Sequence, residues 1–526
     1  MRKNSPKIIS LFFIFCCFAT FSQNSSDKKK INSLIKEAQF YFDNDEYYPS
    51  WQSYRQVLAL ESKNELAGVN GAICMTKLNY PVDSLSPLSS NLRASTLIDA
   101  KYYLAKIKHQ QRAFNEALAL LDTYLKTPAK QRLHSDVETN YLVAMCISAR
   151  SLINSPHRSV IKNIGKNINS AYADYVPVIM PDESALYFTS KREGSSNNKK
   201  NGDNNFFEDV YVSYKTDGVW GKAENVGAPI NTETNDGCVA ISPDGQHMIV
   251  FRTAPDQVSG DLYTTQIGVN NKWEPLQMMN KEINSPYIET SACFSNDTSE
   301  IYFSSDRPGG YGGKDIYRIK KLPNGQWSIP MNLGTTVNSR YDEDAPFMHP
   351  DGVTLYYSSK GHNTMGDFDI FKSVWDPSIN QFSEAENLGY PINDVGSDVF
   401  FILSVDGQRG YYSSIKEETF GGVDIYQIDT RFGDNELKVD EGYVFIGDSP
   451  VRAKIVLTDE ETGTAVGTFN SNPNTGKFIL IFNPLKMYKV EVEADECSPM
   501  TTQITPLPMD KNSHYLNFKL KKSNAQ

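Results

Sequence analysis

Five acidic residues recur in the central part of the chain, each five residues after an asparagine. Each precedes a segment expected to form the innermost strand of a repeated sheet. The five are Asp174, Asp236, Glu289, Glu343 and Asp398. Such a ring of carboxylates could hold a cation such as Ca²⁺ or receive a basic side chain. The alternative, which repetition favours, is that each accepts hydrogen bonds from backbone N–H groups and sets the geometry of its repeat.

The elements that must position these acids form a repeat whose third strand recurs every 52–55 residues. One landmark is the aspartate that opens an Asp-Ile-Tyr-like strand, and it occurs at Asp209, Asp261, Asp315, Asp369 and Asp424. A turn aspartate precedes each, at Asp182, Asp244, Asp297, Asp351 and Asp406, and an aromatic strand such as Tyr302–Ser305 lies between the two. Four strands in a period of this length are typical of a propeller blade. The sequence predicts five blades, with six as the alternative.

The fifth repeat has no fourth strand of its own, because the repeated sequence pattern ends at Arg431. The segment 163–169, upstream of the first repeat, matches 225–231 and 387–393, which lead from one repeat into the next. It can therefore supply the missing outer strand and close the ring, which removes exposed sheet edges.

Composition narrows the classes of function. The chain has 526 residues, a formal net charge of −11 and 12% aromatic residues. An acidic chain without a polybasic patch argues against binding to nucleic acid or to an anionic membrane surface. The cysteines left after residue 23 are odd in number and scattered, so they indicate neither a disulfide framework nor a metal site.

The remaining segments predict a multidomain protein with α and all-β parts. Residues 1–23 have the basic start and short apolar run of a secretory signal peptide, which predicts export to the periplasm, where the protein could associate with the outer membrane. Residues 31–155 follow a helical period with tetratricopeptide-like spacing. The propeller is expected over 157–431, and short alternating strands over 437–522 predict a β-sandwich. No later stretch is long and apolar enough to span a membrane.

Several of these motifs resemble known families. Pro181-Asp182, Pro243-Asp244 and Pro350-Asp351, each followed by an aromatic strand, resemble TolB-like, WD40-like propeller repeats. Residues 454–459 and 475–478 resemble the carboxypeptidase regulatory-like fold. The order of signal, tetratricopeptide repeats, propeller and regulatory-like domain resembles the PorE family of the type IX secretion system of Bacteroidota. That family ends in an OmpA-like domain, which does not follow here before Gln526.

The sequence shows little that indicates catalysis. It has neither a zinc-protease His-Glu pattern nor a G-x-S-x-G motif, and Gly313-Lys314 and Gly476-Lys477 lack the rest of a phosphate loop. The resemblance therefore implies a non-enzymatic scaffold without a cofactor. Its partners would be envelope or outer-membrane proteins, bound through the helical-repeat groove and a propeller face, in or beside type IX secretion. The alternative is a periplasmic sensor whose propeller binds a small ligand, a glycan or a cation.

Overall fold

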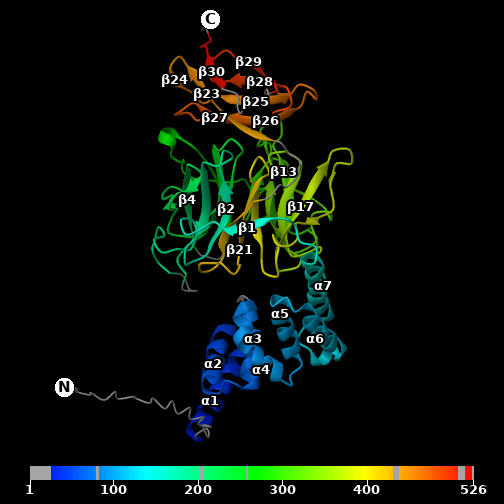
Figure 1. The fold of residues 1–526 in the computed structure, drawn as a ribbon. Coiled ribbons are helices and arrows are strands. Elements are labelled where there is room, and N and C mark those ends of the chain that lie inside the picture. Colours follow the sequence, from blue (N-terminus) through cyan, green and yellow to red (C-terminus); the bar gives the residue numbers. More distant parts are fainter. Residues whose placement is uncertain are drawn as a thin grey trace, which may run out of the picture. The chain divides into compact units, whose positions relative to one another are not determined.

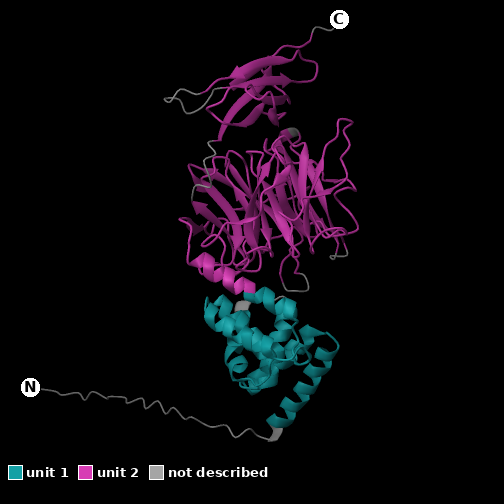
Figure 2. Ribbon diagram, turned by 90° about the vertical axis from the view of Figure 1, so that its right-hand side faces the viewer, with its two compact units in different colours: residues 1–143 teal, residues 144–526 magenta. Residues whose placement is uncertain are grey.

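A computed structural model describes residues 25–78, 82–200, 205–255, 259–429, 437–506 and 516–523. The predicted signal segment, residues 1–23, lies outside these ranges. The chain divides into two compact units, Met1–Val143 and Ala144–Gln526 (Figure 2). The first is helical and the second is mostly β-structure, so the predicted order of a helical part followed by a β-rich part is confirmed.

The helical unit is built from successive helices that pack on their neighbours in the chain. Tyr54 and Val57 of the second helix are buried against Ala38 of the first, and the Asn64 side chain caps the third by accepting from the Ala67 N–H (3.0 Å). The helices are α1 (Ser25–Asp43), α2 (Tyr47–Leu60), α3 (Glu65–Lys77), α4 (Ser89–Ala94), α5 (Asp99–Gln110), α6 (Phe114–Lys126) and α7 (Asp136–Ile153), with 3₁₀ turns η1 (Val82–Leu88) and η2 (Ala129–Gln131). Among the described residues, no helix is both long and apolar enough to cross a membrane.

Five antiparallel sheets follow one another in the second unit and give it a propeller-like fold (Figure 1). Sheets 1 and 2 comprise β2 (Asp174–Ile179), β3 (Ala185–Ser190), β4 (Asp209–Thr216), β5 (Val219–Trp220) and β6 (Glu224–Asn225), then β7 (Asp236–Ile241), β8 (His247–Thr253), β9 (Gly260–Gln266) and β10 (Gln277–Met278). Sheet 3 comprises β11 (Ala292–Phe294), β12 (Glu300–Ser305), β13 (Asp315–Lys320) and β14 (Met331–Asn332).

The last two sheets follow the same order of strands. Sheet 4 comprises β15 (Glu343–Met348), β16 (Thr354–Ser359), β17 (Asp369–Asp376), β18 (Gln381–Phe382) and β19 (Glu386–Asn387). Sheet 5 comprises β20 (Val399–Leu403), β21 (Arg409–Ser414), β22 (Asp424–Asp429) and, from upstream of sheet 1, β1 (Val160–Asn163). The outer strands are two residues long in most sheets, and Trp273 and Trp327 form isolated bridges, to Ile267 and Lys321.

The five sheets form a ring around their innermost strands. Each innermost strand lies beside that of the next sheet, in the order β2, β7, β11, β15 and β20, and β20 lies beside β2. The strand β1 pairs with β22 in antiparallel register, Val160 opposite Asp429 and Asn163 opposite Tyr426. The N-terminal segment of this unit therefore completes the last sheet.

A repeated asparagine anchors each outer segment to its sheet. The Asn338 side chain accepts from the Ile316 N–H (2.8 Å) and donates to the Ile316 carbonyl (3.0 Å). Asn169 makes the same two bonds to Ile425, the residue after the Asp424 that opens β22. This amide reproduces a pair of backbone hydrogen bonds beside the single backbone bond that the outer segment makes to the same residue, which explains why the motif repeats with the sheets.

Residues after 437 form two further sheets with a shared apolar core. The strands are β23 (Lys438–Ile446), β24 (Ser449–Pro450), β25 (Lys454–Asp459), β26 (Ala465–Asn470), β27 (Lys477–Phe482), β28 (Tyr488–Glu493), β29 (Met500–Ile504) and β30 (Leu516–Leu520). One sheet contains β23, β24, β27 and β30, and the other contains β25, β26, β28 and β29. Their inward side chains, among them Leu457, Phe469 and Phe478, make one core. We call residues 437–523 the C-terminal sandwich.

Candidate functional site

The five acids of the repeat lie at the same end of the ring, at or just before the start of each innermost strand. All five are buried, with at most 1% of their surface exposed. Each accepts a hydrogen bond from the backbone N–H four residues earlier, from Ser170, Thr232, Ser285, Ser339 and Asp394. The hydroxyl groups of the first four of these residues donate to the same carboxylates. We call these acids the acid ring.

Four members of the acid ring are paired with a protein cation. The pairs are Asp174–Arg192 (2.5 Å), Asp236–Arg252 (2.6 Å), Glu289–Arg307 (3.1 Å) and Asp398–Lys416 (3.4 Å). Each cation also donates to the carbonyl of the residue before the repeated asparagine, as Arg307 does to Ile283 (2.8 Å). The guanidinium of Arg307 also lies 4.8 Å from the Phe303 ring. The side chains of the protein thus supply the positive charge that a bound cation would supply.

Glu343 is the exception, because Gly361 occupies the position of the cation in sheet 4. A Cβ at Gly361 would lie 2.0 Å from the Ser339 hydroxyl, so no side chain fits there. The next residue, His362, takes over the other contacts: its Nε2 bonds the Val337 carbonyl (2.9 Å) and its ring lies 5.3 Å from the Phe371 ring. Burial raises the pKa of Glu343 to about 7, although hydrogen bonds from Ser339 and Ser359 lower it.

The acid ring does not form a shared cation cage. Within the described ranges, His, Cys, Asp and Glu side chains nowhere gather in a group of three or more that could hold a metal. Each carboxylate is surrounded by its own donors, and none is among the residues that line the central cavity. The five predicted acids thus lie at the same end of the ring, but they do not share one binding site.

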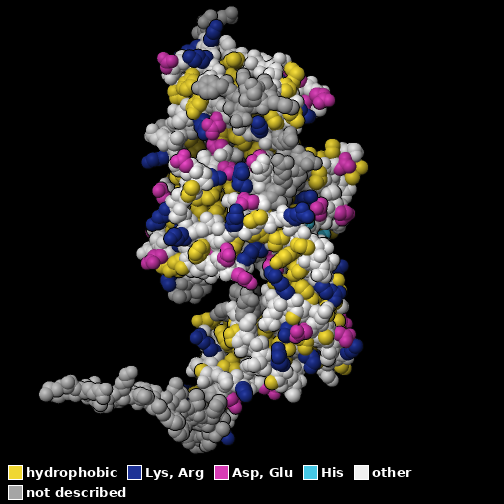
Figure 3. All heavy atoms as spheres, viewed as in Figure 1, with side chains coloured by type: hydrophobic (Ala, Val, Ile, Leu, Met, Phe, Trp, Pro, Cys, Tyr) yellow, Lys and Arg dark blue, Asp and Glu magenta, His cyan; other side chains and the backbone are white. Residues whose placement is uncertain are grey.

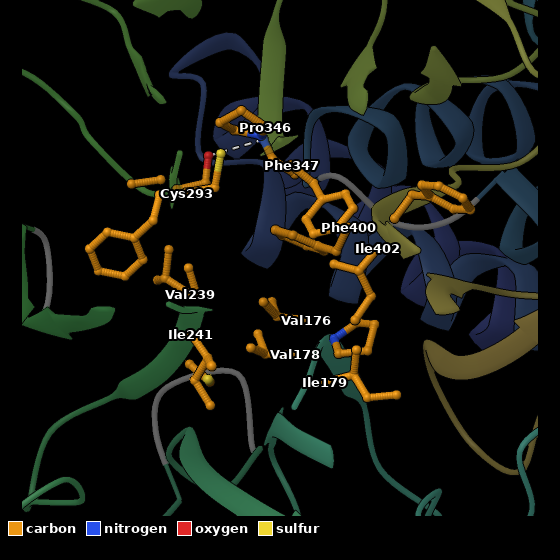
Figure 4. Close-up of a pocket in the computed structure, with 18 of the residues that line it drawn as sticks. Val176, Val178, Ile179, Val239, Ile241, Cys293, Pro346, Phe347, Phe400 and Ile402 are labelled. Atoms are coloured by element: carbon orange, nitrogen blue, oxygen red, sulfur yellow. Dashed lines mark hydrogen bonds between the residues drawn. The ribbon is translucent and has the colours of Figure 1, made fainter. Parts of the chain in front are cut away.

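The cavity lies inside the ring of innermost strands and has a volume of about 290 Å³. Apolar side chains from all five strands line it (Figure 4). They include Val176 and Val178 of β2, Val239 and Ile241 of β7, Cys293 of β11, Phe347 of β15, and Phe400 and Ile402 of β20. We call this cavity the channel. Its lining is typical of sites for small ligands, which are concave and mainly apolar with few polar groups.

Four innermost strands, β2, β7, β15 and β20, bulge where they border the channel, and three of them contain a non-glycine residue with positive φ. Val176, Ala345 and Phe400, each two residues after an acid of the ring, have φ values of 52°, 52° and 57°. Left-handed backbone is costly for a β-branched valine, so neighbouring contacts must hold it. The Ser413 hydroxyl accepts from the Val176 N–H (3.1 Å), which ties sheet 5 to sheet 1. Bulges of this kind re-aim side chains, here towards the channel.

Polar groups gather at the end of the channel near the acid ring. Glu208 lines the cavity and pairs with Lys191 (3.2 Å). Thr290 also lines it, and its hydroxyl accepts from Lys314 (2.8 Å), which pairs with Asp344 (2.8 Å). The β-rich unit otherwise has basic, acidic and apolar side chains interspersed over the face seen in Figure 3.

Sequence reasoning did not identify the channel. Cys238 and Cys293 are both buried, and both line the cavity. Burial raises the pKa of Cys293 to about 12, so the thiol stays protonated near neutral pH. The available signal was the apolar character of the segments after each acid, which reads equally well as packed core.

The solved structures that resemble this chain and are named below each cover about half of it. No family model and no curated protein matches the chain. An α-L-arabinofuranosidase from Podospora anserina is 12% identical, covers 51% of this chain and 94% of its own, and has a TM-score of 0.34. An endo-arabinase from Bacteroides thetaiotaomicron is 14% identical over 51% of this chain and 98% of its own (TM-score 0.36). Similarity at this level transfers neither substrate nor catalytic residues.

These findings correct the predicted family. The relation to TolB-like repeats, to tetratricopeptide repeats and to type IX secretion is wrong: nothing found supports it, and the similar solved structures are glycoside hydrolases. The envelope-protein scaffold, its predicted partners and the expected lack of enzymatic activity are overturned with it. The physical reason is that turn aspartates and aromatic second strands are required by blade packing, so they specify a fold without specifying a family.

Proposed function

We propose that the ring is a closed five-bladed propeller and that its channel binds a small, mainly apolar ligand. The closed order of the innermost strands and the pairing of β1 with β22 support five blades. The observation that carries the function is the channel itself, a cavity of about 290 Å³ with apolar lining from every sheet. Burial of apolar ligand surface there is favourable by about 25 cal/mol per Å².

Glycan processing is the activity of the similar solved structures, and the lining argues for a different ligand here. Glycoside hydrolysis generally uses two carboxyl groups about 5–9.5 Å apart on either side of the scissile bond. Among the described residues that line the channel, Glu208 is the sole carboxylate, and Lys191 pairs with it. A sugar would also leave its hydroxyl groups without partners against the valine and isoleucine side chains.

The proposal is tested by titrating the mature chain with a neutral apolar fluorophore, N-phenyl-1-naphthylamine. We expect saturable binding that Val239→Trp abolishes, because Val239 faces the cavity (Figure 4) and an indole would fill it. The control is Val219→Trp, which adds the same side chain at an exposed position of β5.

Two carbohydrate arms accompany the titration: binding of xylotriose and cellotriose, and release of reducing sugar from arabinan. Saturable binding of the fluorophore in the wild type and in Val219→Trp but not in Val239→Trp supports the proposal. A folded wild-type protein that binds the sugars and ignores the fluorophore would overturn it.

A further inference from the structure

Two Asn-Gly pairs in the described part of the chain have very different surroundings. Asn324-Gly325 lies in the turn after β13, and Asn70-Gly71 lies inside α3. A third pair, Asn201-Gly202, lies outside the described residues. An asparagine followed by glycine is prone to lose its side-chain amide, because glycine has no Cβ to hinder attack by its own backbone nitrogen. The surroundings of each pair decide whether that reaction can occur in the folded protein.

The turn at Asn324 holds the side-chain amide beside the backbone that would attack it. The Gln326 N–H donates to the Asn324 Oδ1 (3.0 Å), so the side chain folds back over the backbone of Gly325. A hydrogen bond to this oxygen stabilises the negative charge that develops on it during attack at the Asn324 Cγ. Gly325 has a φ of 81°, and the space where a Cβ would lie is open. The amide is therefore accessible both to the attacking nitrogen and to water.

One hydrogen bond in the turn opposes the reaction. The Gly325 N–H donates to the Leu322 carbonyl (2.8 Å), and this bond must open before the nitrogen can lose its proton and attack. Every residue from Lys321 to Gln326 is exposed. Local opening of an exposed turn has a low free energy, and here it requires no change in the core. The bond therefore slows the reaction without preventing it.

Asn70 has the opposite surroundings. It is 9% exposed, and its side-chain amide donates to the Tyr54 hydroxyl (2.8 Å). A Cβ at Gly71 would lie 2.9 Å from the Trp51 ring, so the backbone there is closely packed. Attack by the Gly71 nitrogen would require α3 to unfold locally. The same dipeptide is therefore protected in α3 and accessible in the turn after β13.

We propose that Asn324 is a site of spontaneous deamidation, independently of any ligand in the channel. Hydroxide takes the proton of the Gly325 N–H, and the nitrogen bonds to the Asn324 Cγ. The Cγ–Nδ2 bond then breaks, and ammonia leaves after taking a proton from water, which regenerates the hydroxide. Water opens the resulting succinimide ring at either of its two carbonyl carbons. One opening gives aspartate, and the other gives isoaspartate, in which the side-chain carbon continues the backbone.

Isoaspartate at this position loosens the outer edge of sheet 3, because it adds a methylene to the backbone of a closed turn. The Leu322 N–H donates to the Gln326 carbonyl (2.7 Å) across this turn. The next contacts are the bridge between Lys321 and Trp327 and the bond from the Ser328 N–H to the Lys320 carbonyl (2.8 Å). Trp327 packs against the apolar core shared by sheets 2, 3 and 4. These outer contacts open while the inner strands of the sheet stay paired.

The first test incubates the full mature chain at pH 7 and at pH 9 and follows it by peptide mapping with mass spectrometry. We expect the peptide that contains Asn324 to gain the mass by which an oxygen atom exceeds an NH group, and to do so faster at pH 9, where hydroxide is more abundant. Conversion at Asn70 should be about tenfold slower, because α3 must open first. Asn324→Gln should abolish the mass gain, since glutamine would have to close a larger ring.

The second test measures the structural consequence by hydrogen exchange. In the incubated wild type, peptides over residues 320–330 should exchange faster than in fresh protein, while peptides over β11 and β12 stay protected. Asn324→Gln, incubated in the same way, is the matched control and should show no change. Fresh Asn324→Asp carries the new charge without the added methylene, and it should exchange like the fresh wild type.

Three outcomes would overturn parts of this inference. Absence of a mass gain at Asn324, under conditions in which an unstructured peptide with the sequence of residues 319–329 converts, overturns the site. Equal conversion of Asn70 and Asn324 overturns the role given to the surroundings. A mass gain without faster exchange near Trp327 overturns the effect on sheet 3.

Discussion

At the scale of single residues, the members of the acid ring share one arrangement of hydrogen bonds and a paired cation, except that Glu343 has no cation. Four acids form an ion pair with an arginine or lysine. In the repeat of Glu343, Gly361 occupies the position of that cation, and the next residue, His362, bonds the Val337 carbonyl instead of the carboxylate. Burial also lowers the pKa of His362, so its charged form is disfavoured. Burial also raises the pKa of Asp236 and Asp398, which their cations oppose. Glu343 has no cation to oppose the effect of burial, and its pKa of about 7 places its change of charge near neutral pH.

Glu343→Gln tests this deviation through the pH dependence of stability. Because burial raises the folded-state pKa to about 7 from 4.5, the folded protein binds a proton that the unfolded chain lacks between these values. The wild type should therefore lose stability as pH rises from about 4.5 to 7, and the loss persists above pH 7. The variant should be more stable than the wild type by about 1–3 kcal/mol at pH 8 and equal to it near pH 4, measured by urea unfolding.

Glu289→Gln is the matched control, because it leaves the Arg307 guanidinium buried without its carboxylate. This change should destabilise the protein by about 3 kcal/mol at pH 8, opposite in sign to the change at Glu343. A loss of stability at pH 8 for Glu343→Gln of the same size would show that Glu343 is ionised and satisfied like its counterparts.

At the scale of elements, closure of the ring depends on a short segment far from its partner in the chain. The strand β1 supplies the outer strand of sheet 5, Asn163 donates to the Asp424 carboxylate (2.7 Å), and Asn169 pairs with the Ile425 backbone. Without this segment β22 would expose an unpaired edge, and Asp424 would lose the amide that bonds it.

Two truncations of the mature chain test the closure. Removal of residues 24–155 keeps β1 and Asn169, so the rest should unfold cooperatively and stay monomeric. Removal of residues 24–170 deletes both and should give a protein that aggregates or melts over a broad range, measured by circular dichroism and gel filtration. Identical melting of the two truncations would show that β1 contributes nothing to closure.

At the scale of the whole molecule, the N-terminal segment predicts where the protein acts. The basic start and the apolar run within residues 1–23 predict cleavage and export. In expressing cells, we expect the mature protein to begin near Asn24 and to appear in the soluble periplasmic fraction, as measured by N-terminal sequencing and fractionation. A mature N-terminus at a lipidated Cys16 or Cys17 would contradict this prediction.

The sequence by itself determined the repeat, the order of helical and β-rich parts, and the strand that completes sheet 5. These follow from local patterns: a turn aspartate, an aromatic strand and a repeated asparagine keep step because every sheet needs the same bonds. The repeat also predicted that the five acids precede the innermost strands and lie in a ring. The family did not follow, because residues that blade packing requires are shared by propellers of unrelated function.

Only the tertiary structure shows which groups the acids bond and that a cavity lies inside the ring of innermost strands. Arg192 and Arg307 follow their acids by 18 residues, and nothing local shows that they fold back onto them or that Gly361 leaves Glu343 without a cation. The channel exists because five innermost strands meet around one axis, and the bulges at Val176, Ala345 and Phe400 shape its wall. An apolar strand has the same sequence pattern whether its side chains fill a core or border a cavity, and the spacing of the five strands decides between the two.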